Sequence, residues 1–227
     1  MGRTEFDEFA CRYEKTMERS CAMSGESPDF YAKERIQWCF QRLRSYLPTE
    51  TVLDFGCGTG GSIGYFFDIL GCKSVIGIDP SGESLQAAQK RHSGRNVRLS
   101  TPEAFIPSRN IPLAFCNGVF HHIPVSDRLH ALGFIRDSLS ENGIFMFWEN
   151  NPWNPIVVYG MSLNQFDRNA QTLSPRSSVQ MLKAAGFRIQ SVDYCFFFPH
   201  FARGLRKLEP ALRWLPLGAQ YFVLARK

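Results

Sequence analysis

Apolar residues gather in short runs that are separated by segments with helical spacing. The runs are apolar nearly throughout, which is typical of strands covered on both faces of a parallel sheet. Strands that alternate with helices predict right-handed crossovers and a doubly wound, mostly parallel α/β sheet. The expected strands are residues 51–55, 74–78, 97–99, 113–117 and 143–148.

Capping and stop residues support the helices between these runs. Ser126 and Ser174 are expected to cap two helices, and a proline follows Ser174 at the first helical position. Gly71 and Gly186 are expected to end two helices, because glycine readily adopts the left-handed conformation beyond a last turn. The segments between the runs are therefore expected to be helical.

The two ends of the chain depart from the alternation. Residues 3–48 predict two helical stretches around the polar, glycine-containing residues 24–30. Residues 187–198 and 218–227 both resemble strands, and the sequence between them is not an ordinary crossover helix. We expect these two strands to pair directly, so that the last strand is antiparallel.

Composition favours one globular domain over residues 1–227. The chain is 44% hydrophobic, which is enough for one sizeable core, and its formal charge of +5 is spread along the sequence. Such a charge is weak support for nucleic-acid binding. The seven cysteines include no C-x-x-C pair and indicate reduced thiols, with no metal site expected. No run approaches the roughly 18 apolar residues of a membrane span, and the N-terminus has no leader-like core, so we expect a cytoplasmic protein.

The stretch VLDFGCGTGGSIGYFFDILG places closely spaced glycines directly after a predicted strand. Gly56, Gly58 and Gly61 fit the G-x-G-x-x-G pattern of dinucleotide sites, and Asp79 follows at a distance suited to binding a ribose diol. A nicotinamide dinucleotide and S-adenosylmethionine both carry such a ribose, so these residues leave both open. Asp54 favours the second ligand, because a carboxylate there repels a pyrophosphate and attracts an ammonium group.

Two further features point the same way, namely the antiparallel last strand and the motif NGVFHHIP directly after the fourth strand. With them the chain resembles the class I S-adenosylmethionine-dependent methyltransferases, strongly over residues 50–150 and more loosely over the C-terminal strand pair. The resemblance implies a Rossmann-like sheet of seven strands with S-adenosylmethionine as cofactor. It also implies a helical lid over residues 1–48, a cofactor-binding core over 49–150 and an acceptor side over 151–227.

The resemblance further implies which residues bind the cofactor. Asp54 and the glycines would surround the methionyl end, and Asp79 would bind the ribose hydroxyls. Tyr31 of the lid would contact the methionyl carboxylate, and Glu103 stands near the usual adenine contact. The implied set is Tyr31, Asp54, Gly56, Cys57, Gly58, Gly60, Asp79, Pro80, Ser81, Glu103 and Asn117.

His121 and His122 are candidate general bases. They follow the fourth strand, at the carboxyl ends of strands where open α/β sheets bind ligands. An imidazole with a reference pKa of about 6.5 accepts a proton near neutrality. Alignment can contribute up to roughly 7–11 kcal/mol to methyl transfer, whereas a base adds about 10²–10⁴-fold, so a base helps without being required. The alternative is that at least one of the two histidines is architectural.

The stretch WENNPWNPIVVYG after the fifth strand is the expected acceptor side. Glu149 is a third catalytic candidate, because it places a carboxylate where the acceptor should lie. Asn150 and Asn151 would offer amides to the acceptor, and Trp153 and Tyr159 would offer aromatic walls. The alternative is a proline-stabilised loop whose asparagines satisfy its own backbone.

Residues 196–218 form a basic amphipathic segment, which can pack on its own domain, cover a hydrophobic acceptor or touch a membrane surface without inserting. We expect methylation of a small molecule, at oxygen first and carbon second, with a hydrophobic or lipid-linked acceptor included. Methylation of protein or RNA is the alternative, disfavoured because the chain shows no RNA-binding module or dense basic stripe. A non-catalytic binding module and a nicotinamide oxidoreductase are the remaining alternatives.

Overall fold

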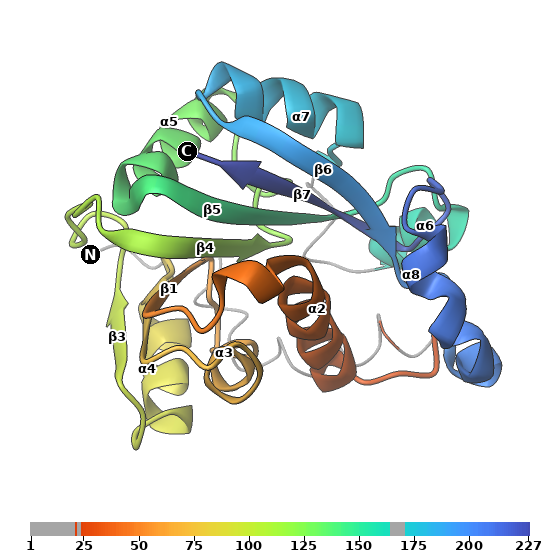
Figure 1. Cartoon of the computed structure of the whole chain (residues 1–227), viewed down its shortest axis with the longest axis horizontal. Coiled ribbons are helices and arrows are strands. Elements are labelled where there is room, and N and C mark those ends of the chain that lie inside the picture. The colour runs from red at the N-terminus through yellow and green to blue at the C-terminus, as the bar shows by residue number, and fades with distance from the viewer. Residues whose placement is uncertain (1–20, 22–23, 164–170) are drawn as a thin grey trace.

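The computed structural model describes residue 21, residues 24–163 and residues 171–227, which fold around one seven-stranded sheet (Figure 1). The strand order is β3-β2-β1-β4-β5-β7-β6. Strand β7 runs antiparallel to both of its neighbours, and the other neighbouring pairs are parallel, as the sequence predicts. The strands are β1 (Thr51–Phe55), β2 (Ser74–Ile78), β3 (Val97–Ser100), β4 (Ile111–Asn117), β5 (Leu139–Asn150), β6 (Arg188–Cys195) and β7 (Gln220–Arg226).

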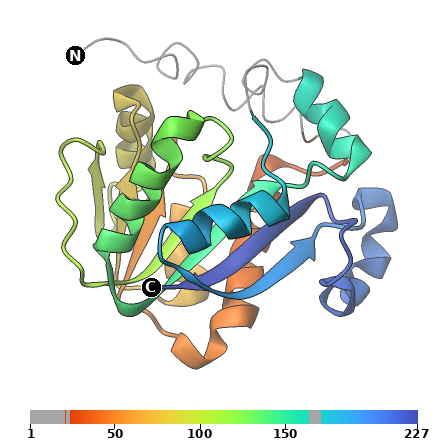
Figure 2. The same cartoon turned by 90° about the horizontal axis from the view of Figure 1, so that it is seen from above.

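Helices cover both faces of the sheet. Helices α2, α3 and α4 lie below it in Figure 1, and α5 and α7 lie above it, side by side when the molecule is seen from above in Figure 2. The helices are α2 (Pro28–Leu43), α3 (Ile63–Leu70), α4 (Gly82–Arg91), α5 (Val125–Ser138), α6 (Pro155–Leu163), α7 (Pro175–Ala184) and α8 (Glu209–Leu212), with the 3₁₀ helices η1 (Arg44–Tyr46) and η3 (His200–Leu208).

Burial on both faces of the sheet explains why residues 143–148 of β5 are apolar throughout. Successive side chains of a strand point to opposite faces. Phe145 and Phe147 belong to the core cluster that packs under α5 and α7, whereas Met146 and Trp148 belong to the cluster under α2 and α3. A stretch of strand that is buried on both faces therefore carries apolar residues at successive positions.

Local signals place most helix ends. The Ser27 hydroxyl caps α2 by accepting a hydrogen bond from the backbone N–H of Phe30 at 3.1 Å, so this helix begins inside the stretch expected to interrupt it. Ser174 caps α7, as predicted. The prediction for Ser126 is wrong, because α5 begins at Val125 without a side-chain cap. Apart from residue 21, the first helical stretch expected in 3–48 lies outside the described residues.

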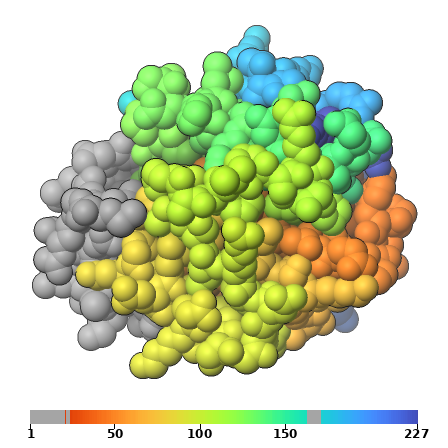
Figure 3. Space-filling model, turned by 90° about the vertical axis from the view of Figure 1, so that its left-hand side faces the viewer, coloured from red at the N-terminus to blue at the C-terminus, as the bar shows by residue number. Residues whose placement is uncertain are grey.

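The topology creates one place where a ligand can enter between the strands. The strand order reverses between β1 and β4, whose following helices pack on opposite faces of the sheet. Open α/β sheets bind ligands at such a switch point, outside the carboxyl ends of the strands. Figure 3 shows the sheet edge beside it, where β3, α4 and the loop after β3 form the surface.

Candidate functional site

The glycine-rich loop after β1 has a backbone that larger residues could not follow. Gly56, Gly58 and Gly60 have φ angles of 75°, 50° and 78°, a region that favours glycine. A Cβ on Gly56 would lie 2.2 Å from Cγ2 of Val119, in the loop after β4. The backbone N–H of Gly56 also donates to the carbonyl oxygen of Ile78, at 2.7 Å. The loop is thus drawn tightly between β2 and the segment that follows β4.

Asp79, directly after β2, ties this loop to helix α4. Its Oδ2 accepts a hydrogen bond from the backbone N–H of Gly58 at 2.8 Å, and its Oδ1 accepts one from Ser81 at 2.9 Å. Each carboxylate oxygen has two lone pairs, so this anchoring is compatible with a further hydrogen bond from a ligand hydroxyl. The buried Asp79 carboxylate therefore has a fixed position at the edge of a cavity.

Two cavities meet at the glycine loop. The larger has a volume of about 580 Å³ and the smaller about 320 Å³. Gly56, Gly58, Thr59 and Asn117 line both of them. Together they form a trough across the carboxyl ends of β1, β2 and β4, which suits an elongated ligand bent over the glycines.

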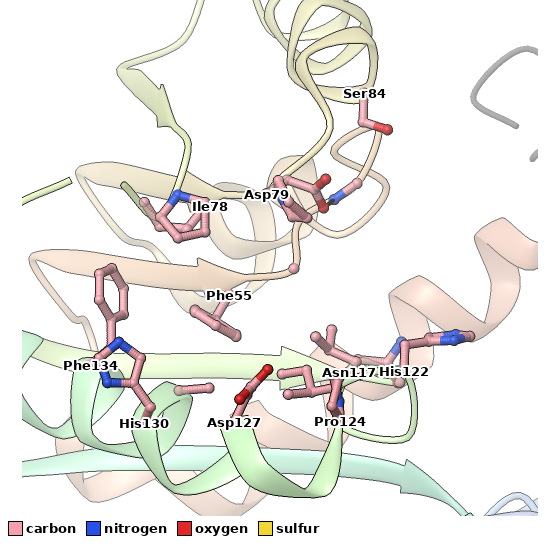
Figure 4. A pocket seen from close by; sticks show the side chains of 18 of the residues that line it. Phe55, Ile78, Asp79, Ser84, Asn117, His122, Pro124, Asp127, His130 and Phe134 are labelled. Atoms are coloured by element: carbon pink, nitrogen blue, oxygen red, sulfur yellow. Dashed lines mark hydrogen bonds between the residues drawn. The ribbon is translucent and has the colours of Figure 1, made fainter. Parts of the chain in front are cut away.

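The larger cavity is mostly apolar with acidic groups on its walls (Figure 4). Asp79 lies on the wall beside α4, and Asp127, His130 and Phe134 face it from α5. Phe55 lies between the two walls in the same view. A flat aromatic base joined to a hydroxyl-bearing sugar, as in a nucleoside, matches this combination of apolar surface and hydrogen-bond acceptors.

The smaller cavity contains a buried carboxylate and potential partners for a zwitterion. Burial, with a lesser contribution from repulsion by Asp79, raises the pKa of Asp54 from 3.8 to about 8. Tyr31 and Arg35 of α2 line the same cavity. Burial also raises the pKa of the Tyr31 phenol, so this group stays a neutral hydrogen-bond donor. An α-amino acid group fits here, because its ammonium would pair with Asp54 and its carboxylate with α2.

Asn117, the last residue of β4, lines both cavities and carries an unsatisfied side-chain atom. Its side-chain Oδ1 is buried and has no hydrogen-bond partner among the described residues. A buried acceptor without a donor costs about 1–3 kcal/mol. The atom is thus suited to a donor on a bound ligand, such as an ammonium or a hydroxyl group.

Comparison with known proteins agrees with this geometry. Residues 53–145, which contain the glycine loop, Asp79 and both histidines, match the family model described as a methyltransferase domain. Residues 53–145 therefore form a methyltransferase domain, and the chain has the fold of solved S-adenosylmethionine-dependent methyltransferases. Trans-aconitate 2-methyltransferase from Rhizobium etli is 33% identical over 92 residues, a match that covers 40% of this chain and 35% of the relative.

Other similarities to the methyltransferase domain are longer and more distant. Malonyl-[acyl-carrier protein] O-methyltransferase 2 from Coxiella burnetii is 24% identical over 82% of this chain and 75% of its own. The crystal structure of an S-adenosylmethionine-dependent methyltransferase from Thermotoga maritima has a TM-score of 0.65 and 19% identity, covering 98% of both chains. This structural likeness confirms the fold over nearly the whole length.

The residues of the methyltransferase domain fit its family's cofactor. S-adenosylmethionine has a nucleoside end and an amino-acid end, as the two cavities require, and Asn117 offers the acceptor that a donor would satisfy. Of the residues expected to bind it, Pro80 and Glu103 line the larger cavity, and Tyr31, Asp54 and Cys57 line the smaller. Six cysteines, Cys57 among them, are free thiols in the described part of the chain.

Two of the residues expected to bind the cofactor line neither cavity, namely Gly60 and Ser81. Ser81 is fully buried, and its hydroxyl caps α4 by accepting a hydrogen bond from the backbone N–H of Ser84 at 3.1 Å. Gly60 shapes the loop through its positive φ, but Gly61 is the one of the two that lines a cavity. Both residues thus shape the backbone around the site without lining either cavity.

The adjacent histidines of the methyltransferase domain have different surroundings. His122 lines the larger cavity. His121 is buried, and its Nδ1 lies 2.6 Å from Oε2 of Glu149 on β5. Glu149 is buried as well, and its Oε1 accepts a hydrogen bond from the backbone N–H of Phe120 at 3.0 Å. The carboxylate lines neither of the two cavities, so its placement is that of a residue that orients His121.

The two asparagines of the expected acceptor side form hydrogen bonds within the chain. Asn151 is fully buried, with its Nδ2 donating to the carbonyl oxygens of Pro216 and Gly218. Asn151 lines neither of the two cavities, and its expected contact with an acceptor stays a prediction. Asn150 accepts a hydrogen bond on Oδ1 from the side chain of Gln220 at 2.9 Å.

The two expected aromatic walls lie on the surface. Trp153 stacks on Tyr194 and is half exposed, and Tyr159 is exposed on α6. Neither lines one of the two cavities. Their expected role as walls of an acceptor pocket is therefore not supported by contacts with the described trough.

His92 at the end of α4 supports the glycine-rich loop, and no local sequence pattern predicts this contact. Its Nε2 lies 2.8 Å from the carbonyl oxygen of Gly60. Because a carbonyl only accepts, Nε2 must carry the hydrogen. Burial lowers the pKa of His92 and favours this neutral form.

Among the described residues no helix is long and apolar enough to cross a membrane, and no group of histidine, cysteine or acidic side chains is placed to hold a metal.

Proposed function

We propose that the chain transfers the methyl group of S-adenosylmethionine to a small-molecule acceptor, at oxygen in the first place and at carbon in the second. The observation that carries this proposal is the trough with a carboxylate in each cavity, Asp54 in the smaller and Asp79 in the larger. A ligand with a sugar diol at one end and an ammonium at the other matches both carboxylates at once.

The side chains of the trough would bind and orient the cofactor. Asp79 would accept hydrogen bonds from the ribose hydroxyls, and Asp54 would pair with the ammonium. Tyr31 and Arg35 would meet the carboxylate of the amino-acid end, since both line the smaller cavity. The cofactor supplies a methyl group on a positively charged sulfur. Fixing both ends of the molecule aligns that group with the acceptor, which is the larger part of the catalytic effect expected here.

A histidine after β4 would take the proton of an acceptor hydroxyl. His122 reaches the cavity directly, and His121 is held in one orientation by Glu149. A base positioned by a buried carboxylate keeps one tautomer and one ring direction, as in other catalytic pairs of this kind. We therefore assign Glu149 a positioning role and keep both histidines as candidate bases.

The choice of a small molecule and of oxygen is supported by relatives and by charge. The relatives reported above include a trans-aconitate 2-methyltransferase and an O-methyltransferase, although the first matches this chain over only 35% of its own length. The net charge of +5 is modest and spread along the sequence, which gives little support to an RNA acceptor.

A transfer assay with isotopically labelled cofactor tests the proposal. The purified full chain is mixed with fractionated cell extract and S-adenosylmethionine that carries a ¹³C-labelled methyl group. We expect label in a small-molecule fraction, with a carbon chemical shift typical of a methyl group on oxygen. Asp79→Asn should lose the transfer, whereas Asp137→Asn, an exposed aspartate on α5, should retain it. Label found only in protein or RNA, or in no fraction, contradicts the proposal.

A further inference from the structure

One end of the molecule carries large apolar side chains in contact with solvent. They lie on η3 and on the turn between α8 and β7, at the end opposite the face shown in Figure 3. Phe201 and Trp214 are 89% and 71% exposed, and Leu205, Leu208 and Leu217 are exposed as well. Leu205 and Leu208 share a face, because residues three apart eclipse in a 3₁₀ helix. Large apolar groups gathered in this way mark an interaction surface.

The segment of residues 200–217 is fastened to the domain, so the exposure does not come from a frayed end. The buried carboxylate of Glu209 accepts hydrogen bonds from three consecutive backbone N–H groups, those of residues 196–198. The backbone N–H of Tyr194 donates to the carbonyl oxygen of Arg213 at 2.7 Å. These bonds hold the backbone in place while the apolar side chains point outward.

Basic side chains stand among the exposed apolar ones. Residues 200–217 contain four basic residues and one acidic residue, and the acidic one is the buried Glu209. Arg206 is paired with Glu26 and Arg213 with Asp193. Arg203 and Lys207 are exposed on η3 beside Phe201 and Leu205. The outer surface of the segment is therefore apolar and positively charged.

The start of α6 extends this surface. The Nδ2 atom of Asn154 donates to the carbonyl oxygen of Leu217 at 2.9 Å, which joins the first turn of α6 to the end of the segment. Trp153 and Ile156 beside it are 51% and 64% exposed. In both Figure 1 and Figure 2, α6 lies at the same end of the molecule as η3 and α8.

We propose that residues 200–217 dock the protein on the surface of an anionic lipid bilayer. Exposed Phe and Trp side chains suit the interface between acyl chains and headgroups, and the neighbouring Arg203 and Lys207 suit negatively charged lipids. This charge complementarity favours a bilayer over a second copy of the chain, which would bring the same cations together. The docking is peripheral and reversible, because the segment lies along the surface.

The docking surface contacts the stretch of chain that leads into the lining of the smaller cavity. The backbone N–H of His200 donates to the carbonyl oxygen of Ser24 at 2.8 Å, and Arg206 pairs with Glu26 at 2.7 Å. The next two residues, Ser27 and Pro28, line the smaller cavity. A protein docked through this segment therefore holds the lid end of its cofactor site near the lipid headgroups.

Vesicle flotation with the full chain tests the proposal. We expect the protein to float with vesicles that contain phosphatidylglycerol, to float much less with phosphatidylcholine alone, and to dissociate as ionic strength rises. Arg203→Glu combined with Lys207→Glu should weaken binding by at least about tenfold, since each basic side chain at an anionic surface contributes about fivefold. Phe201→Ala combined with Trp214→Ala should weaken it by a similar factor.

Matched controls come from surfaces outside the segment. Ile106→Ala removes an exposed apolar side chain from the opposite end, and Arg176→Glu with Lys183→Glu reverses two exposed charges on α7. Both controls should bind vesicles like the unaltered chain, and circular dichroism should show that every variant is folded. The proposal is overturned if the chain floats with neither vesicle, or if the η3 charge reversal leaves flotation unchanged. Dimerisation that depends on Phe201, without vesicle binding, would also overturn it and assign the surface to a second copy.

Discussion

Glu149 and His121 form a buried pair, with Oε2 of the carboxylate 2.6 Å from Nδ1 of the imidazole. The carboxylate comes from β5 and the imidazole from the loop after β4. A neutral imidazole that donates from Nδ1 has its lone pair on Nε2. The pair therefore fixes both the direction of the ring and the nitrogen that can accept a proton.

Replacing Glu149 by Gln should lower kcat by at least about tenfold, with the KM for S-adenosylmethionine nearly unchanged. The amide can donate to Nδ1 and so favours the tautomer in which Nε2 carries the hydrogen. The measurement is steady-state kinetics across a range of pH with the acceptor found in the labelling assay. Glu141→Gln, an exposed glutamate on the same strand, is the control. Equal rates for Glu149→Gln and the unaltered chain would remove the pair from the mechanism.

Cofactor binding should become tighter as pH rises toward about 8, the value to which burial raises the pKa of Asp54. Only the ionised carboxylate attracts an ammonium group, and well below the pKa its fraction changes about tenfold per pH unit. Titration calorimetry over this range measures the effect. Asp54→Asn should bind weakly with no such trend. A flat pH dependence in the unaltered chain would argue against the pairing.

The free energy of unfolding of the unliganded protein should also depend on the protonation of Asp54. Unlike cofactor binding, it should become less favourable to the folded state as pH rises. The folded state of Asp54 holds its proton up to about pH 8, whereas the unfolded state releases it near 3.8. Between these values the native state binds more protons, so the contribution of Asp54 to stability falls as pH rises. Thermal unfolding of Asp54→Asn should lack this decline, and a decline of equal size in both proteins would assign it to other groups.

Gly56→Ala should destabilise the fold by about 1–3 kcal/mol, through its positive φ and the 2.2 Å approach of the new Cβ to Val119. Urea unfolding measures the loss. Adding Val119→Ala to this variant should recover part of it, because the steric contact is relieved while the backbone strain remains. Gly133→Ala in α5, where a Cβ meets nothing within 4 Å, should be neutral or stabilising. Equal effects at the two glycines would contradict the close approach.

His92→Ala should weaken cofactor binding, because the carbonyl oxygen of Gly60 loses its hydrogen-bond donor and the glycine loop loses a support. His92→Gln restores a donor and should recover part of the affinity, whereas Lys90→Ala on the same helix should have no effect. Burial lowers the pKa of His92 in the folded state, so its contribution to stability is present above the unfolded value near 6.5 and is lost as pH falls below that value through the lower folded pKa. Titration calorimetry on the three variants measures their affinity for the cofactor.

The fold and the cofactor trough could be predicted from the sequence because their signals are local. Asp54 and Gly56 lie at the end of one strand, and Asp79 lies at the end of the next strand along the chain, so the carboxyl edge of a parallel sheet brings them together. The apolar run of β5 and the cap at Ser174 likewise depend on neighbours in sequence. Local spacing placed these residues, and the resemblance to a known family supplied the cofactor.

The rest of the site depends on contacts between distant residues. Glu149 reaches His121 across 28 positions, and His92 reaches Gly60 across 32. Asn151 looked like a ligand-binding amide, but the carbonyl groups that occupy it come from the turn before β7. No periodicity or motif reports such pairings, because an asparagine that binds a ligand and one that binds backbone have the same local sequence.

Calorimetric titration of the full chain with S-adenosylmethionine, S-adenosylhomocysteine and NAD tests the central claim most directly. The account predicts saturable binding of the first two, with Asp54→Asn and Asp79→Asn both weakening it, and no heat of binding with NAD. Saturable binding of NAD together with no response to either sulfur nucleoside would contradict the account.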